Sequence, residues 1–138
     1  MSTLPPSLPT PPAERSVWNA MGRGAVCRCP ACGEGRMFRA YLKVVDRCDA
    51  CGEDLSHHRA DDAPAYFTMM IVGHIIVGGV LVLERTVAPE MWVHMVLWLP
   101  LTMGMSLGLL PMVKGALVGL QWALRMHGFE AESPSRPQ

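Results

Sequence analysis

Four cysteines in two closely spaced pairs are the residues of this sequence best suited to chemistry. The first pair reads Cys29-Pro-Ala-Cys32-Gly and the second reads Cys48-Asp-Ala-Cys51-Gly, with residues 33–47 between them. Two residues between thiolates let one tight turn direct both sulfurs at the same ion, and the glycine after each pair supplies left-handed backbone. The spacing predicts a structural zinc site whose ligands are Cys29, Cys32, Cys48 and Cys51.

Disulfides and redox-active C-x-x-C pairs are the alternatives to zinc. A segment of about thirty residues has too little core to fold without a metal or bridges. Four protein ligands fill a tetrahedron, so the sequence predicts a structural rather than a catalytic ion. Between the pairs, residues 37–45 favour a short strand pair. Cys27 lies outside the pairs, and we expect either a spare thiol or a role in ligand exchange or metal transfer.

A second polar cluster, HHRADD at residues 57–62, directly precedes an apolar segment. Its two aspartates come just before Pro64, where a helix N-terminus favours negative charge and a capping side chain. Capping does not account for two adjacent histidines beside an arginine. We therefore predict a polar collar that holds the cysteine-bearing segment against a membrane or a partner, formed by His57, His58, Arg59, Asp61 and Asp62.

Charge is distributed unevenly along the 138 residues, although the formal net charge is zero. Most of the twelve Lys and Arg residues precede position 64, whereas residues 64–124 carry few charges. A neutral chain has no global field that favours nucleic acid or acidic substrates. The proline-rich residues 1–21 lack the apolar core of a signal peptide and are expected to form a disordered tail, as are residues 130–138.

Two uncharged segments, residues 64–83 and 91–113, are long enough to cross a bilayer as helices. At 1.5 Å per residue, each spans roughly the 30 Å of the hydrocarbon core. The connection at residues 84–90 is short, so the two spans must form an antiparallel hairpin over residues 64–113. A soluble core helix is rarely apolar on every face for this length.

Lys and Arg also predict the orientation of this hairpin. The connection contains only Arg85, whereas most positive residues precede the first span and others follow the second. The positive-inside rule therefore places both termini in the cytoplasm and the connection outside. A reducing cytoplasm favours thiols and zinc over disulfides.

The polar residues after Pro111 fall on one stripe of a helix. Lys114, Gln121 and Arg125 predict an amphipathic helix at the cytoplasmic membrane surface, over residues 114–129. The alternative is that the second span continues beyond a proline kink. The predicted fold class is an α+β small membrane protein, with a zinc ribbon and linker at residues 22–63, a two-helix transmembrane hairpin and a C-terminal amphipathic helix.

Two histidines lie within the predicted spans. His74 is near the middle of the first span and His94 is near the outer end of the second. An ionisable residue at such a position suggests function, and the alternative is a neutral ring hydrogen-bonded to a neighbouring helix. Their depths differ by about 9 Å, which is too far for joint haem ligation within one hairpin. Met91, His94 and Met95 share one helix face and would suit cuprous copper, although methionine is also ordinary packing material.

Several motifs together resemble the uncharacterised bacterial family called domain of unknown function 983. They are CPACGEGRMF, YLKVVDRCDACG, HHRADDAPAYF, VGHIIV and PMVKGALVGLQWALRMHGFE, within residues 22–130. The resemblance implies a small zinc-ribbon protein of the bacterial inner membrane. It also implies a connection with haem-copper cytochrome oxidase subunits and assembly factors, because genes of the family often neighbour theirs. It implies no catalytic residue and no family role for Cys27.

We expect an accessory protein, without catalysis, that aids assembly or stability of a respiratory haem-copper oxidase. Its partners would be oxidase subunits or assembly factors, membrane lipid and, through the glycines of the first span, a second copy of the chain. A membrane-tethered ribbon that binds nucleic acid is the alternative, although its positive charge is small. Further alternatives are a small haem- or copper-handling membrane protein and an enzyme or transporter that uses the HHRADD cluster and His74.

Overall fold

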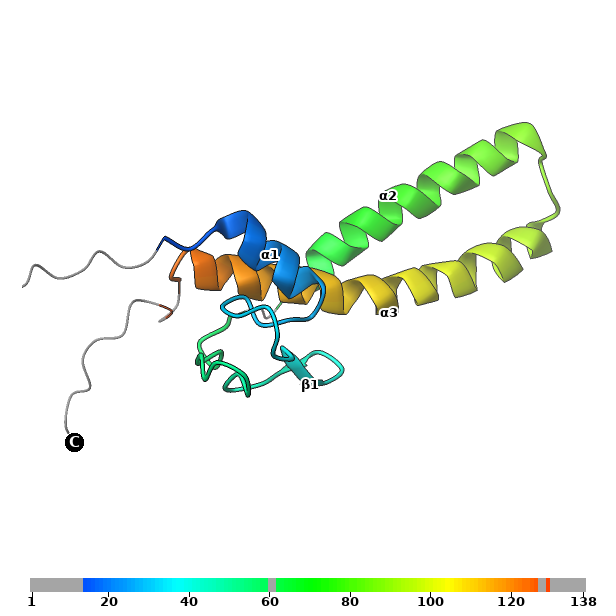
Figure 1. Cartoon of the computed structure of the whole chain (residues 1–138). Coiled ribbons are helices and arrows are strands. Elements are labelled where there is room, and N and C mark those ends of the chain that lie inside the picture. Colours follow the sequence, from blue (N-terminus) through cyan, green and yellow to red (C-terminus); the bar gives the residue numbers. More distant parts are fainter. Residues whose placement is uncertain (1–13, 60–61, 127–128, 130–138) are drawn as a thin grey trace, which may run out of the picture.

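Two long helices and a small cysteine-bearing segment make up the computed structural model, which describes residues 14–59, 62–126 and 129. Helices α2 and α3 extend side by side from a region where α1 and the strand pair gather around the C-terminal end of α3 (Figure 1). The elements in chain order are α1 (Val17–Ala25), β1 (Phe38–Ala40), β2 (Lys43–Val44), α2 (Ala63–Thr86) and α3 (Met91–Ala123).

Helices α2 and α3 are long and apolar enough to cross a membrane. Most of their large apolar side chains are exposed, including Met69 at 65% and Val96 at 66%. The core helix of a soluble protein would bury such side chains, and exposed apolar faces of this extent mark contact with lipid or protein. Length, composition and exposure together suggest a membrane location.

Helix α3 differs from the predicted arrangement of a span followed by a separate surface helix at 114–129. It runs without interruption through Pro100 and Pro111 to Ala123. The polar residues that suggested a separate helix contact the chain itself. The Lys114 ammonium donates to the carbonyl oxygen of Leu42 at 2.6 Å, and the Gln121 amide bonds both backbone groups of Arg59. The alternative, in which the second apolar helix continues beyond the proline, is the arrangement found.

Contacts between α2 and α3 define their relative register. Glu84 bonds His94, and the Trp98 ring lies against Gly79. By continuation of this antiparallel pairing, Lys114 lies level with the first turn of α2. Residues 115–123 of α3 therefore extend about 13 Å beyond the start of α2. We call residues 115–123 the stem.

Helix α1 packs on the stem by direct contact of the two backbones. A methyl group added at Gly24 or Gly115 would overlap the carbonyl group of the other, and one at Gly119 would overlap the carbonyl group of Ala20. Small residues four positions apart on both helices permit this close approach. The expectation of a disordered tail over residues 1–21 is therefore wrong for residues 17–21, which lie in a helix begun by the Ser16 cap. The rest of that tail up to residue 13, and residues 130–138, lie outside the described residues.

The cysteine-bearing segment and the stem share one hydrophobic core. Met37 and Leu55 are fully buried and belong to the same cluster as Val118 and Trp122 of the stem. The ribbon and the C-terminal helix, which the sequence predicts as separate regions, are therefore packed as one unit.

The tip of the strand pair is attached to α3 beside Pro111. Strands β1 and β2 are antiparallel and lie within residues 37–45, where the sequence predicts a strand pair. Pro111 has no N–H, so the carbonyl group of Leu107, four residues earlier, has no helical donor. The Tyr41 hydroxyl donates to this carbonyl oxygen at 2.7 Å. This bond, with that of Lys114, connects the strand pair to α3 and satisfies the backbone group that the proline releases.

Candidate metal centre

The four cysteine sulfurs lie within 4.8 Å of one another. Across the two pairs, the Sγ atoms of Cys29 and Cys51 are 3.7 Å apart, and those of Cys32 and Cys48 are 3.8 Å apart. A disulfide would bring two sulfurs to about 2.05 Å. Four ligands at about 2.3 Å from a tetrahedral zinc ion lie about 3.8 Å from one another. The four thiols are free and fit a tetrahedral metal ion such as zinc.

Each cysteine pair lies in a tight turn of the predicted kind. Gly33 and Gly52 both have a φ of 75°. The N–H of Gly33 donates to the carbonyl oxygen of Cys29, and the N–H of Gly52 donates to that of Cys48. The two turns thus use the same backbone geometry to direct their sulfurs at one point.

The backbone around the first turn also makes one thiol more acidic than an ordinary cysteine. The N–H groups of Gly35 and Glu34 point at the Cys32 sulfur from 3.5 and 3.4 Å, and they lower the pKa of Cys32 to about 6. Burial raises the pKa of Cys29 to about 12 and also raises that of Cys51. Metal binds to thiolates rather than to thiols. Cys32 is already mostly a thiolate at neutral pH, so it can bind a metal ion without first losing a proton.

We expect iodoacetamide, added together with a strong metal chelator at pH 7, to alkylate Cys32 before the other three ligand cysteines, because the turn around Cys32 is still formed when the metal leaves. With a pKa of about 6, Cys32 is mostly thiolate at that pH. Its rate should fall as the pH drops below about 6, because the thiolate is then protonated. Peptide mapping by mass spectrometry measures the order. Faster reaction of Cys51, which is the more exposed thiol, would contradict the assignment, and metal-loaded protein is the control.

Gly35 is a residue of this centre that the sequence analysis missed. A methyl group at Gly35 would overlap the Cys48 sulfur. The carbonyl oxygen of Gly35 also accepts from the Cys29 N–H at 2.8 Å, which closes the first turn. The signal in the sequence was the second glycine of the segment CGEG, two residues after Gly33.

Replacing Gly35 with alanine should lower the affinity for zinc by tenfold or more. The added methyl group must displace the Cys48 sulfur, and a displaced ligand loses tetrahedral geometry. Competition with a chromophoric chelator measures the affinity. Gly22→Ala is the matched control, since nothing lies within 4 Å of the methyl group it adds. Equal affinities of the two variants would show that Gly35 is not constrained by the site.

Cys27 does not join the four-cysteine group. Its backbone has a φ of 61°, and its carbonyl oxygen accepts from the Met37 N–H at 3.1 Å. Burial raises the pKa of its thiol. The residue is placed to turn the chain from α1 into the ribbon, and the prediction of a role in ligand exchange or metal transfer gains no support.

The residues of the predicted polar collar have separate contacts. His57 lies 3.5 Å from the Asp54 carboxylate, and its ring meets Phe129 edge-on at 5.9 Å between centroids. The Nδ1 atom of His58 is 2.7 Å from the carbonyl oxygen of Leu55, and Arg59 is held through its backbone by Gln121. The Ser56 hydroxyl and N–H lower the pKa of Asp54, which the collar did not include. His57, His58 and Arg59 thus contact their own loop and the C-terminal part of the chain.

Asp62 is the aspartate of the collar that lies within the described residues. Asp62 occupies the N-cap position of α2 ahead of Pro64, but its side chain makes no capping hydrogen bond there. The predicted position is therefore found without the predicted bond. Asp61 lies outside the described residues.

His94 connects α2 with α3 through both ring nitrogens. Trp98 donates its indole N–H to Nδ1 at 3.1 Å, and an indole can only donate. The proton of the neutral ring is therefore on Nε2, which donates to the Glu84 carboxylate at 3.1 Å. This arrangement is the alternative of a histidine bonded to a neighbouring helix. It leaves no ring nitrogen for copper with Met91 and Met95 unless these bonds break.

His74 is exposed on α2 and belongs to no cluster of metal-binding side chains in the described ranges. Its Nδ1 atom is 2.7 Å from the carbonyl oxygen of Met70, one turn earlier in the same helix. The structure does not bring His74 and His94 together, so nothing supports a haem or copper site between them.

A known protein family matches most of the elements described above. The family described as Protein of unknown function (DUF983) matches residues 38–122, which is more than half of the chain. The chain belongs to this family. Comparisons with curated proteins and with solved structures found no match.

The DUF983 match covers the strand pair, the second cysteine pair, α2 and nearly all of α3. It begins after Cys29 and Cys32, so the first half of the metal centre in this DUF983 protein rests on the structure and not on the family match. Family membership, the four-cysteine group and two apolar helices together fit a membrane zinc-ribbon protein.

Proposed function

We propose that this protein is a non-catalytic accessory protein of the bacterial inner membrane, with both termini in the cytoplasm. The hairpin of α2 and α3 would cross the membrane, and the zinc ribbon would be a cytoplasmic docking platform. Its partner would be a respiratory haem-copper oxidase or an assembly factor, the class that the family resemblance implies. The observation that carries the proposal is the rigid attachment of a four-cysteine centre to the end of an apolar helix.

Four thiolates in a closed tetrahedron support a structural role for the metal, because no ligand position is left for a substrate. When bound, the ion would supply folding energy to the ribbon and no chemistry on a substrate. Bonds from Tyr41, Lys114 and Trp122 then transmit the position of the ribbon to α3. A platform fixed in this way presents its exposed side chains at a constant depth relative to the membrane helices.

Deleting the gene and measuring haem-copper oxidase activity and subunit abundance tests the proposal. We expect both to fall, and we expect the wild-type gene and Cys27→Ser to restore them. Cys48→Ser should fail to restore them, because the platform is lost with the metal. Unchanged oxidase activity and subunit abundance in the deletion strain would refute the proposed partner.

Replacing His57 and His58 with alanine tests the docking surface itself. The His57 side chain is 46% exposed, and the pair lies on the loop that joins the ribbon to α2. We expect weaker co-purification of the membrane partner in mild detergent, with the zinc content unchanged. Arg39→Gln, on the exposed strand β1, is the control. Full partner recovery with the double variant would place docking elsewhere.

A further inference from the structure

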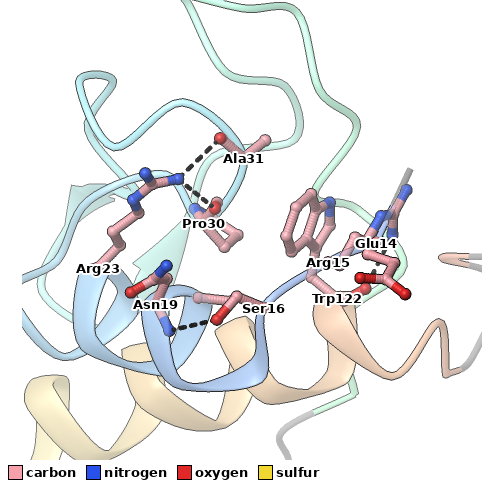
Figure 2. Close-up of a pocket in the computed structure, with 9 residues that line it drawn as sticks. Glu14, Arg15, Ser16, Asn19, Arg23, Pro30, Ala31 and Trp122 are labelled. Carbon is pink, nitrogen blue, oxygen red and sulfur yellow. Dashed lines mark hydrogen bonds between the residues drawn. The ribbon is translucent and has the colours of Figure 1, made fainter.

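A pocket that the proposed function does not use lies between α1, the first cysteine turn and the stem (Figure 2). Its volume is about 310 Å³. Its polar and aromatic lining comes from α1, from the residues just before it and from the stem, and it is open to solvent on one side. The residues concerned are Glu14, Arg15, Ser16, Asn19, Arg23 and Trp122.

Two arginines line this pocket with fixed guanidinium groups. The Nη1 atom of Arg23 donates to the carbonyl oxygens of Pro30 and Ala31 at 3.2 and 3.0 Å. The Nη1 atom of Arg15 donates to the carbonyl oxygens of Trp122 and Phe129 at 2.8 and 3.1 Å. A guanidinium has five N–H donors, so each arginine keeps donors that these bonds do not use.

Among the residues that the structure describes, no ion pair neutralises the positive charge of the two arginines. Within the described ranges, neither guanidinium has a carboxylate oxygen within 4.0 Å, although Glu14 also lines the pocket and the Glu53 carboxylate attracts Arg15 from farther away. Arg15 is partly buried with its guanidinium 4.3 Å from the centre of the Trp122 ring, and this burial lowers its pKa. Arg23 is exposed, and an arginine held in place in a concave surface can bind phosphate oxygens with its free donors.

The pocket begins at the depth of lipid headgroups if α2 and α3 cross the membrane, a premise that the inference takes from the proposed function. Ala20 lies against Gly119 and Gly24 lies against Gly115, so α1 runs antiparallel to the stem. By this pairing Arg23 lies about 3 Å beyond Lys114, which is level with the start of α2. Phospholipid phosphates occupy this zone just outside the hydrocarbon core.

We infer that this pocket binds a phosphate-bearing anion, and that its source is the headgroup of an anionic phospholipid. Arg23 donates to the phosphate oxygens, the Asn19 side chain at the exposed rim offers a further donor, and the charge of Arg15 attracts the anion from the far end of the pocket (Figure 2). Bound lipid would hold α1 and the first cysteine turn at the membrane surface. The binding depends on charge and geometry, and requires no contact with a protein partner.

Native mass spectrometry of the full-length, zinc-loaded protein in detergent tests this inference. The probes are phosphatidylglycerol, phosphatidylcholine and inorganic phosphate. We expect preferential retention of phosphatidylglycerol, weakened about tenfold in Arg23→Gln and less strongly in Arg15→Gln. Arg39→Gln removes the same charge from an exposed strand position and should retain the lipid as wild type does.

Asn19→Asp is a second variant that keeps both arginines and their bonds to backbone carbonyls. Its carboxylate should repel or replace the phosphate, so lipid retention should fall while zinc content stays the same. Displacement of phosphatidylglycerol by inorganic phosphate would also support the site. If inorganic phosphate binds and no lipid is retained, the anion site stands and a soluble phosphate is its source.

Equal retention of both lipids by wild type and by all variants, without an effect of inorganic phosphate, would overturn the inference. The lipid measurement uses purified protein, so its outcome is independent of oxidase levels in the deletion strain. If the oxidase proves not to be the partner, the lipid result still stands. If the protein retains no lipid, the oxidase proposal still stands.

Discussion

Cys48→Ser is expected to abolish zinc binding and to unfold the ribbon, while α2 and α3 stay helical. Cys48 is only 3% exposed and its sulfur is 3.8 Å from that of Cys32. The ribbon contains two very short strands and has little core of its own. Structural zinc contributes on the order of 10 kcal/mol to folding of such segments. Without it, the entropy of ordering the segment is not offset.

Elemental analysis and limited proteolysis measure this effect. Zinc should be absent from Cys48→Ser, and residues 26–59 should become sensitive to protease, while far-ultraviolet circular dichroism still shows most of the helix content. Cys27→Ser is the matched control, because Cys27 lies outside the four-cysteine group. Similar zinc contents in the two variants would show that Cys48 is not a ligand.

Trp122→Ala is expected to destabilise the packing of the ribbon on the stem by about 3–5 kcal/mol, the usual cost of removing a buried tryptophan. Trp122 is 9% exposed and lies in the core that both regions share. Its indole N–H donates to the Glu53 carboxylate at 2.8 Å, and its ring contacts the Arg15 guanidinium. The variant loses the packing, the hydrogen bond and the cation–π contact together.

Urea titration monitored by protease sensitivity of the ribbon measures this loss of stability. Trp18→Ala provides a matched control, because Trp18 is 83% exposed and its removal should change stability by about 0.5 kcal/mol or less. A midpoint shift of the same size in both variants would mean that the shared core does not hold the ribbon.

The metal centre was predictable because its signal is local. The residues of each C-x-x-C-G turn determine the shape of that turn. The grouping of Cys29, Cys32, Cys48 and Cys51 then required only that the two turns face each other. Helix α2 was predictable for a similar reason, since its length and uniform apolarity are contained in one segment.

The packing around the stem could not be predicted in this way. Ala20 and Gly24 permit close helix packing only because Gly119 and Gly115 lie opposite them, and these glycines are far away in sequence. The proline at 111 would ordinarily favour a break, but Tyr41 supplies the donor that the Leu107 carbonyl lacks. These contacts become visible only when the chain is folded.

The polar stripe of α3 gave a misleading signal for the same reason. Polar side chains on one face of a terminal helix usually indicate water or headgroups. Here Lys114 and Gln121 bond the backbone of Leu42 and Arg59. The stripe is therefore a binding surface for the chain's own ribbon, which periodicity alone cannot distinguish from a surface that faces solvent.

The metal content of the purified full-length protein tests the central claim most directly, because the ribbon, its attachment to α3 and the docking platform all depend on it. Inductively coupled plasma mass spectrometry, with free thiols counted after denaturation, should find about one zinc ion per chain and all five cysteines reduced. Protein that is well folded without metal, or whose paired cysteines form disulfides, would contradict the account.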